Sequence, residues 1–263
     1  MFSSVKLGEV ANIKGGKRLS KGDTFSIEPT DHPYIRAQDI RNGKIKSDDL
    51  VYITDAQHSK IKNYIANEGD VCITIVGANV GEIGIVPKEL DGANLTENAV
   101  KLVNLKDLDE RFLFYSLLHP RPQEEMRLLA GGAAQPKLGI YKVAQVEISY
   151  PPLPIQSKIV DVLSAYDDLI EVNTRRIRIL EQMAQSVYRE WFGKVDVQSL
   201  PEGWEITKLS EIAAVNPTSI KRGNEPEEIN YVDIASVSTG RIDLVQPMRF
   251  SEAPGRARRI VQH

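Results

Sequence analysis

Basic side chains gather near the N-terminus of an otherwise slightly acidic chain. The protein has 263 residues and a formal net charge of -3 at pH 7. Between residues 14 and 46, the basic residues outnumber the acidic ones: Lys14, Lys17, Arg18, Lys21, Arg36, Arg41, Lys44 and Lys46 against Asp23, Glu28, Asp31 and Asp39. A local excess of positive charge is typical of a surface that contacts a phosphate backbone. A solvated charged face without a partner explains the pattern equally well.

The sequence contains no motif for catalysis or for a cofactor. It has neither the Asn-Pro-Pro-aromatic tetrapeptide of adenine methylation nor a glycine-rich loop suited to S-adenosylmethionine. It also lacks a Walker phosphate loop and the Asp, Glu-x-Lys pattern of common nucleases. The single cysteine, Cys72, excludes a disulfide within the chain. His32, His58, His119 and His263 have no metal-ligand spacing, so we expect surface histidines and no metal site.

Short apolar runs separated by glycine and asparagine predict strands in the first part of the chain. These runs are PYIRAQDI, DVCITIV, GEIGIVP, AVKLV and QVEISY. The stretch VGANVGEIGIVP is typical of a hairpin whose turn uses positive φ at Gly77, Asn79 and Gly81.

A helix is expected from Leu108, and Pro120 would stop it. The segment AGGAAQPKLGI from Ala130 is predicted to be a small-residue loop, and loops on a rigid scaffold often carry binding residues. Together with the strands, these features predict an α+β domain with a mixed β-sheet and short helices.

Three prolines precede a long helical pattern. Pro151 and Pro152 favour an extended backbone, and Pro154 can occupy the first turn of the helix that follows. Apolar residues then recur every three or four positions. At 1.5 Å per residue, a helix over residues 155–192 is about 57 Å long, so we expect a spacer that needs a partner helix. The residues expected to pair are Ile159, Val162, Leu169, Asn173, Ile177, Leu180, Val187 and Trp191.

Asn173 is the polar member of this stripe. Its spacing of four residues to both Leu169 and Ile177 makes a stutter, which relaxes left-handed supercoiling. A polar residue at such a position can fix the register between two helices. The alternative is that Asn173 faces solvent where the stripe drifts around the helix.

The end of the chain repeats its beginning. VKLGEVANI at Val5 aligns with TKLSEIAAV at Thr207, and YIRAQDIRNGKI at Tyr34 aligns with YVDIASVSTGRI at Tyr231. A repeat with a period of about 200 residues indicates two related domains joined by the long helix.

The series KLGEVANI, YIRAQDIRNGKI, GDVCITIVGANVGEIGIVP and ISYPPLPIQSKIVDVL resembles the specificity subunit of type I restriction-modification systems, over essentially the whole chain. The resemblance implies target recognition domains that each read one part of a split DNA target, and helices that pair antiparallel as a coiled coil. In these terms residues 1–150 are the first recognition domain, residues 151–195 the conserved spacer helix, and residues 196–263 the N-terminal part of a second domain. We expect this chain to lack the rest of that second domain and the second helix.

The resemblance also implies partners. These are double-stranded DNA and the methyltransferase and restriction subunits, which would use S-adenosylmethionine, ATP and Mg, whereas this non-catalytic subunit would bind no cofactor itself. A second copy of the chain could pair with the spacer helix to give a homodimer. Because the sequence has no signal peptide and no run of roughly 18 apolar residues, we expect a cytoplasmic protein without a membrane segment.

Comparing the two copies separates expected scaffold from expected DNA contacts. We assign the shared residues to folding, and they are Tyr34, Ile35, Ile40, Gly43 and Ile45, which match Tyr231, Val232, Val237, Gly240 and Ile242. Polar residues that differ are candidates for base readout, because Arg and Gln side chains bind base edges. They are Arg36, Gln38, Asp39 and Arg41, replaced by Asp233, Ala235, Ser236 and Ser238. Drift on a solvated strand face explains any one of these replacements at least as well.

Basic residues that keep their charge are candidates for phosphate contacts, which position DNA without specifying its sequence. Lys44 corresponds to Arg241, and the pair Lys17 and Arg18 to Lys221 and Arg222. The full set of candidate DNA-binding residues is Lys14, Lys17, Arg18, Arg36, Gln38, Asp39, Arg41 and Lys44. The alternative function is an interaction scaffold whose helix assembles a complex without reading DNA, and a steep salt dependence of DNA binding would distinguish the two.

Overall fold

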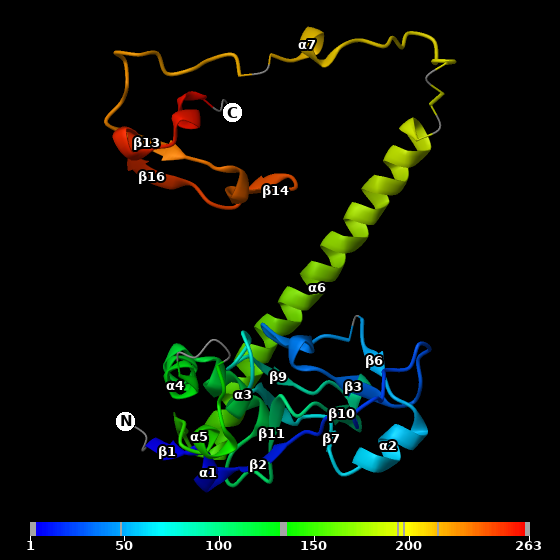
Figure 1. The fold of residues 1–263 in the computed structure, drawn as a ribbon, viewed down its shortest axis with the longest axis vertical. Coiled ribbons are helices and arrows are strands. Elements are labelled where there is room, and N and C mark those ends of the chain that lie inside the picture. The colour runs from blue at the N-terminus through cyan, green and yellow to red at the C-terminus, as the bar shows by residue number, and fades with distance from the viewer. Residues whose placement is uncertain are drawn as a thin grey trace. The chain divides into compact units, whose positions relative to one another are not determined.

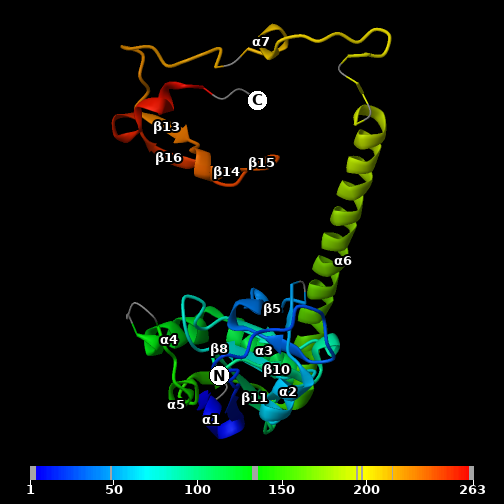
Figure 2. The ribbon, with the colours of Figure 1, turned by 45° about the vertical axis from the view of Figure 1, so that its right-hand side comes forward.

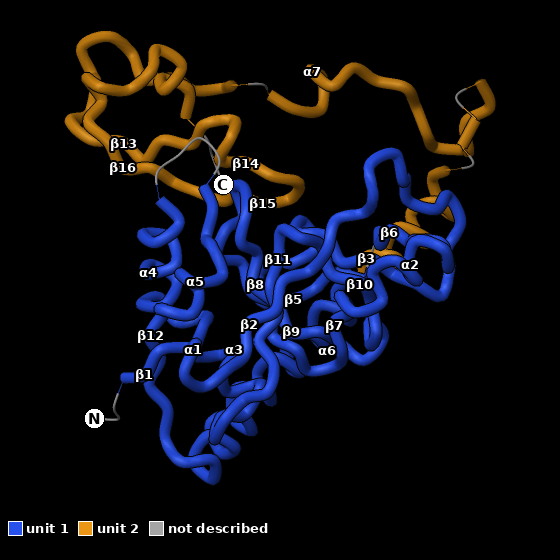
Figure 3. The backbone as a smooth tube through the Cα atoms, turned by 60° about the horizontal axis from the view of Figure 1, so that its bottom comes forward, with its two compact units in different colours: residues 1–178 blue, residues 179–263 orange. Residues whose placement is uncertain are grey.

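The computed structural model describes residues 4–47, 49–131, 136–193, 195–196, 198–214 and 216–260. The chain divides into two compact units, residues 1–178 (unit 1) and residues 179–263 (unit 2), which Figure 3 colours separately. None of the helices in the described ranges is long and apolar enough to cross a membrane.

Unit 1 is built on β-sheets (Figure 1). The largest sheet has the strand order β2-β11-β8-β9-β5-β4, formed by Asn12–Gly15, Ala99–Val103, Val71–Thr74, Ile83–Ile85, Gly43–Ile45 and Ile40–Arg41. A four-stranded sheet has the order β6-β3-β10-β7, formed by Val51–Tyr52, Pro33–Ile35, Ala93–Leu95 and Ile65–Ala66. A third, two-stranded sheet pairs β1 (Ser4–Lys6) with β12 (Glu147–Ser149). The pairings are antiparallel except those of β5 with β9 and of β3 with β10, so the expected mixed α+β fold is confirmed.

Short helices connect and cover these strands. They are α1 (Leu7–Val10), α2 (Asp55–Ile61), α3 (Glu110–Leu118), α4 (Pro120–Ala130) and α5 (Ile140–Val143), with the 3₁₀ turns η1 (Ala37–Asp39) and η2 (Lys88–Leu90).

The helix predicted from Leu108 is α3, which begins at Glu110 because the Asp109 carboxylate accepts a hydrogen bond from the Phe112 N–H at 2.9 Å. Pro120 ends α3 as expected, but it also starts α4, which the sequence did not predict. A proline fits the first turn of a helix because the N–H groups there have no partner within the helix. Of the loop expected from Ala130, residues 132–135 lie outside the described residues, and α5 forms its far end.

Three apolar clusters stabilise unit 1, a small one of Tyr34, Ile53 and Ile61 and two larger ones. The largest packs the helices and β12 against one face of the large sheet, with Leu7, Ile73, Leu102, Leu113 and Met126 fully buried. The second lies between the two larger sheets and contains Ile35, Ile40, Cys72 and Leu95. Burial raises the pKa of the Cys72 thiol to about 12, so this cysteine is a core residue rather than a reactive group.

The hairpin predicted around Gly77 exists, with β8 and β9 paired antiparallel. Gly77 and Gly81 have the expected positive φ of 96° and 89°. The prediction for Asn79 was wrong, since this residue is not among those with positive φ. Asn79 is the first residue of a turn, because its carbonyl accepts a hydrogen bond from the Glu82 N–H at 3.0 Å. The first position of a turn does not require positive φ.

The long helix α6 spans Leu153–Phe192, two residues longer than predicted at its N-terminus. Its 40 residues extend about 60 Å, and Pro154 lies in its first turn as expected. Figures 1 and 2 show the N-terminal part of α6 beside α3, where the Tyr115 hydroxyl donates to Asp167 at 2.6 Å. Gln156 and Val160 are its buried residues.

Unit 2 repeats part of the element order of unit 1. It contains α7 (Leu209–Ile212), the strand pairs β13–β16 (Glu228–Tyr231 and Gln246–Arg249) and β14–β15 (Val237–Ser238 and Arg241–Ile242), and the 3₁₀ turns η3 (Ile234–Ser236), η4 (Phe250–Glu252) and η5 (Gly255–Arg258). By position in the repeat, α7 corresponds to α1, β13 to β3, η3 to η1, β14–β15 to β4–β5, and β16 to β6.

The shared residues have the same backbone roles in both copies. Gly43 and Gly240 have φ of 76° and 75° at equivalent hairpin turns, where only glycine is free of strain. In unit 1, Tyr34, Ile35, Ile40 and Ile45 are buried, as expected of scaffold residues. The repeat seen in the sequence is therefore also a repeat of local structure.

Candidate nucleic-acid interface

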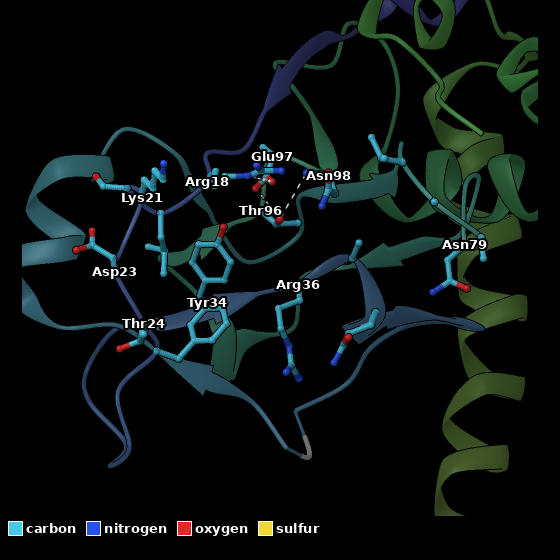
Figure 4. Close-up of a pocket in the computed structure, with 18 residues that line it drawn as sticks. Arg18, Lys21, Asp23, Thr24, Tyr34, Arg36, Asn79, Thr96, Glu97 and Asn98 are labelled. Carbon is cyan, nitrogen blue, oxygen red and sulfur yellow. Dashed lines mark hydrogen bonds and ion pairs between the residues drawn. The ribbon is translucent and has the colours of Figure 1, made fainter. Parts of the chain in front are cut away.

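A groove of about 870 Å³ opens on unit 1 among loops that are distant in the sequence (Figure 4). Its walls come from residues 18–25, from Tyr34 and the start of η1, from residues 76–79 between β8 and β9, and from residues 96–98 between β10 and β11. The groove thus lies where connections of the two larger sheets meet.

Backbone contacts fix the floor of the groove. The Lys17 N–H donates to the Leu95 carbonyl at 2.8 Å, and the Tyr34 hydroxyl donates to the Lys17 carbonyl at 2.8 Å. A Cβ on Gly16 would lie 2.1 Å from the Thr96 carbonyl oxygen, so only glycine permits this close approach. The Thr96 N–H in turn donates to the Ile35 carbonyl at 3.0 Å. The chain entering the groove is therefore held to both β3 and the loop after β10.

The two arginines that line the groove are paired with carboxylates. Arg18 Nε donates to Glu97 Oε1 at 2.5 Å, and this hydrogen bond raises the pKa of the Arg18 guanidinium. Arg36 Nη2 donates to Asp39 Oδ1 at 2.8 Å and to the Asp49 carbonyl at 2.9 Å, and the hydrogen bond to Asp39 raises the pKa of Arg36. Asp39 is buried and also accepts the Arg36 backbone N–H at 2.8 Å. Arg36 and Asp39 thus close the turn η1 between them.

The second copy closes the same turn with different residues. In η3, Asp233 Oδ1 accepts hydrogen bonds from the backbone N–H and the hydroxyl of Ser236, both at 2.7 Å, which lowers the pKa of Asp233. The pair Arg36 and Asp39 and the pair Asp233 and Ser236 are therefore alternative caps of one turn. Capping accounts for this difference between the copies without base readout.

The predicted DNA-binding residues are not all brought together. Arg18, Arg36 and Gln38 line the groove, whereas Lys14, Lys17, Asp39, Arg41 and Lys44 do not. Lys17 is exposed, with Nζ 5.7 Å from the centroid of the Tyr64 ring. Lys14 is exposed on β2, opposite Lys101. Lys44 Nζ lies 3.9 Å from Glu171 on α6.

Although Arg41 does not line the groove, it contacts a residue that does, because its Nη2 donates to Asn79 Oδ1 at 3.0 Å. The sequence pattern did not identify Asn79, Thr96 and Asn98 as groove residues. The sequence pattern predicted only that Asn79 lies in a turn. The alternation of glycine and asparagine around this residue was the one signal in the sequence for an exposed polar loop.

Two histidines differ from the expectation of surface positions. His32 and His58 are half-buried and stack with ring centroids 3.9 Å apart and an interplanar angle of 4°. The Nδ1 atom of His58 lies 2.8 Å from Oδ1 of the buried Asn94. His119 is exposed and caps α4, and His263 lies outside the described residues. The described residues contain no group of three or more His, Cys, Asp or Glu side chains that could hold a metal ion.

The residues expected to pair along α6 are exposed in the single chain. Accessible fractions range from 37% at Ile159 to 69% at Trp191. Asn173 is exposed as well, between Leu169 and Ile177 of the same helix. The remaining members of this stripe are Val162, Leu169, Ile177, Leu180 and Val187.

Comparisons with known proteins agree with this architecture. The sequence model described as "Type I restriction modification DNA specificity domain" matches residues 2–182. Among curated proteins, the type I restriction enzyme MjaVIII specificity subunit of Methanocaldococcus jannaschii is 27% identical, covering 90% of this chain and 56% of that protein. The HindI specificity subunit of Haemophilus influenzae is 25% identical, covering 95% of this chain and 52% of that protein. The chain thus spans about half the length of the curated relatives that it matches.

A solved structure has the same fold. The S subunit of a type I restriction-modification system from M. genitalium superposes with a TM-score of 0.53 at 20% identity, covering 73% of this chain and 46% of that chain. The family match extends from the first strand through the groove-bearing sheets into α6. This chain therefore belongs to the family of type I restriction-modification DNA specificity domains.

Proposed function

We propose that this chain recognises DNA sequence for a type I restriction-modification complex, and that unit 1 contacts one part of a split target. The observation that carries this proposal is the groove of unit 1, which is lined by polar loop residues and flanked by exposed lysines, within the segment that matches the family. Polar side chains on rigid loops can contact base edges, and basic residues beside them can contact phosphates.

The helix α6 fits the role of a spacer between half-sites. Its length of about 60 Å exceeds one turn of duplex DNA, which is roughly 34 Å. The local structure of unit 1 recurs in unit 2, as expected if residues 196–263 form part of a second target recognition domain. These features support a bipartite target.

Catalysis would belong to other subunits. In this proposal, methyltransferase and restriction subunits bind S-adenosylmethionine, ATP and Mg, and this chain directs them to the target without binding a cofactor itself. The exposed apolar stripe of α6 would be covered in the complex by a second helix, and a second copy of the chain could supply it.

Binding to duplexes of random sequence, followed by sequencing of the bound fraction, tests the proposal. We expect one enriched motif and a binding constant that falls steeply between two salt concentrations, because phosphate contacts release counterions. Enrichment of no motif, or DNA binding that salt does not weaken, would instead favour the alternative, an interaction scaffold that does not read DNA.

A further inference from the structure

The contact between Arg41 and Asn79 determines what the wall of the groove can offer to a ligand. Arg41 is exposed on β4, and its Nη2 lies 3.0 Å from Asn79 Oδ1. A guanidinium group has only hydrogen-bond donors, so the amide atom that faces it must be the oxygen. The Asn79 amide nitrogen therefore points away from Arg41.

That nitrogen is directed at the groove. Asn79 is half-buried and lines the groove, and Figure 4 shows its nitrogen turned toward the other lining residues and its oxygen turned away. Among the hydrogen bonds of the described residues, none uses Asn79 Nδ2. Asn79 thus presents two N–H donors and no acceptor to whatever occupies the groove.

The loop that carries Asn79 is rigid. The Val80 N–H donates to the Gly77 carbonyl at 3.1 Å, and the Glu82 N–H donates to the Asn79 carbonyl at 3.0 Å, so two successive turns enclose the residue. The side chain of Glu82 also binds the β4–β5 turn, because its Oε2 accepts the Asn42 N–H at 2.9 Å. Arg41 and Asn79 are therefore held on two elements that are themselves connected.

The two arginines of the groove are engaged by other groups. Arg18 pairs with Glu97, and Arg36 is held by Asp39 and the Asp49 carbonyl. A ligand that contacts Arg18 or Arg36 meets a guanidinium that already donates hydrogen bonds to other groups. The hydrogen bond from Arg41 to the Asn79 oxygen, in contrast, orients the Asn79 amide and leaves its two N–H donors available to a ligand. Asn79 is consequently the groove residue best prepared to discriminate between hydrogen-bonding partners.

We propose that Asn79 reads one base of the DNA target as a donor only, and that Arg41 is the positioning residue that imposes this orientation; the inference rests on the proposed function. An unrestrained asparagine pairs with adenine by donating to N7 and accepting from N6. With its oxygen held by Arg41, Asn79 instead binds only an acceptor, such as O6 or N7 of guanine or O4 of thymine, and with adenine it keeps the hydrogen bond to N7 but loses the one from N6. Cytosine is excluded, because its major-groove edge presents the N4 donor.

The test compares motifs selected from random duplexes by the wild-type chain and by three variants. Asn79→Asp replaces the donor by an acceptor, so the preference at one position should change to cytosine. Arg41→Met releases the amide, so cytosine should become tolerated and adenine should be bound more favourably at that same position. Lys44→Met removes the same charge from the neighbouring strand β5 and should weaken binding without changing the motif. At the affected position we expect discrimination to change by about tenfold or more.

Each outcome decides the inference. If Asn79→Asp selects the wild-type motif, Asn79 does not read a base. If Asn79→Asp changes one position but Arg41→Met leaves that position unchanged, Arg41 does not set the orientation. If the wild-type chain selects no motif, the proposed function fails and the inference fails with it. Asn79→Ala, which should only lose discrimination at that position, supplies the same test should the aspartate variant not fold.

Discussion

Arg36 and Asp39 differ in residue type from Asp233 and Ser236, their counterparts in the second copy, yet both pairs close a turn. Charged residues that differ between two repeated segments can therefore have a structural role. Their hydrogen bonds close η1, and Asp233 with Ser236 closes the equivalent turn η3. The Asp39 carboxylate is buried and already accepts hydrogen bonds from Arg36, so it is not available to accept one from a base. At the scale of residues, the candidates for readout are therefore Gln38 and Asn79, which line the groove.

Exchanging the cap of unit 1 for that of unit 2 tests this interpretation. Asp39→Ala should lower the free energy of unfolding by about 1–3 kcal/mol, because it removes the buried acceptor of the backbone N–H and the guanidinium of Arg36. The double variant Arg36→Asp with Asp39→Ser should recover most of that loss, since the same pair of residue types caps η3. Urea unfolding followed by far-UV circular dichroism measures both values. A double variant no more stable than Asp39→Ala would show that the two caps are not interchangeable.

Lys17 and Arg18 are expected to contact phosphates rather than bases. Replacing both by alanine should weaken binding to all DNA sequences about equally and reduce the slope of log affinity against log salt by about 1 for each phosphate that is no longer neutralised. The same charge is removed by Lys62→Ala with Lys88→Ala, both exposed and outside the groove, and this control should leave the slope nearly unchanged. A decrease in affinity confined to one sequence would identify Lys17 and Arg18 as base-reading residues.

At the scale of elements, a buried glutamine joins α6 to unit 1. Gln156 is fully buried, and its Oε1 accepts the Asp109 N–H at 2.9 Å. Its Nε2 donates to the carbonyls of Asp107 at 2.9 Å and Pro151 at 2.7 Å. The glutamine therefore fixes the first turns of the helix to the loop before α3 and to the proline segment. Together with the Tyr115–Asp167 hydrogen bond, this contact sets the direction in which α6 leaves the sheets.

Removing this side chain should destabilise unit 1. Gln156→Ala takes the side-chain partner from three backbone groups and should lower the free energy of unfolding by about 2–4 kcal/mol. Gln185→Ala, on the exposed surface of the same helix, should change it by no more than about 0.5 kcal/mol. Far-UV circular dichroism or hydrogen exchange should be used, because Trp191 and Trp204 both belong to unit 2 and do not report on unit 1. Equal effects of the two substitutions would contradict this role of Gln156.

The sequence predicts elements well where the pattern is long and local. The stripe of α6 repeats over about ten turns, and the prolines before it mark its start, so its bounds were predicted to within two residues. Helix α4 was missed because Pro120 signals both the end of one helix and the first turn of another. The groove could not be predicted, because it joins loops near residues 18, 38, 79 and 97 that only the pairing of strands brings together.

At the scale of the whole molecule, the bare stripe of α6 indicates association. Large apolar side chains along it are exposed, and burying each one is worth about 1.5–3 kcal/mol before ordering costs. An antiparallel pair of α6 helices from two copies would bury both stripes and place two recognition domains in a two-fold arrangement, which favours a palindromic split target. A helix from another subunit could cover the same surface.

Self-pairing makes a prediction for the isolated chain. We expect a dimer in sedimentation at micromolar concentration, and Leu180→Asp should dissociate it because the substitution buries a charge in the middle of the stripe. Gln185→Asp introduces the same charge off the stripe and should leave the dimer intact. A wild-type chain that sediments as a soluble monomer would refute self-pairing.

The most direct test of sequence recognition is to map methylated sites in cells that carry this chain together with a type I methyltransferase subunit. We expect methylation of a single split motif that disappears when this chain is deleted, and that changes at one base position when Asn79→Asp replaces the wild type. Methylation of the same motif in the absence of this chain would contradict its role as the DNA-recognition subunit.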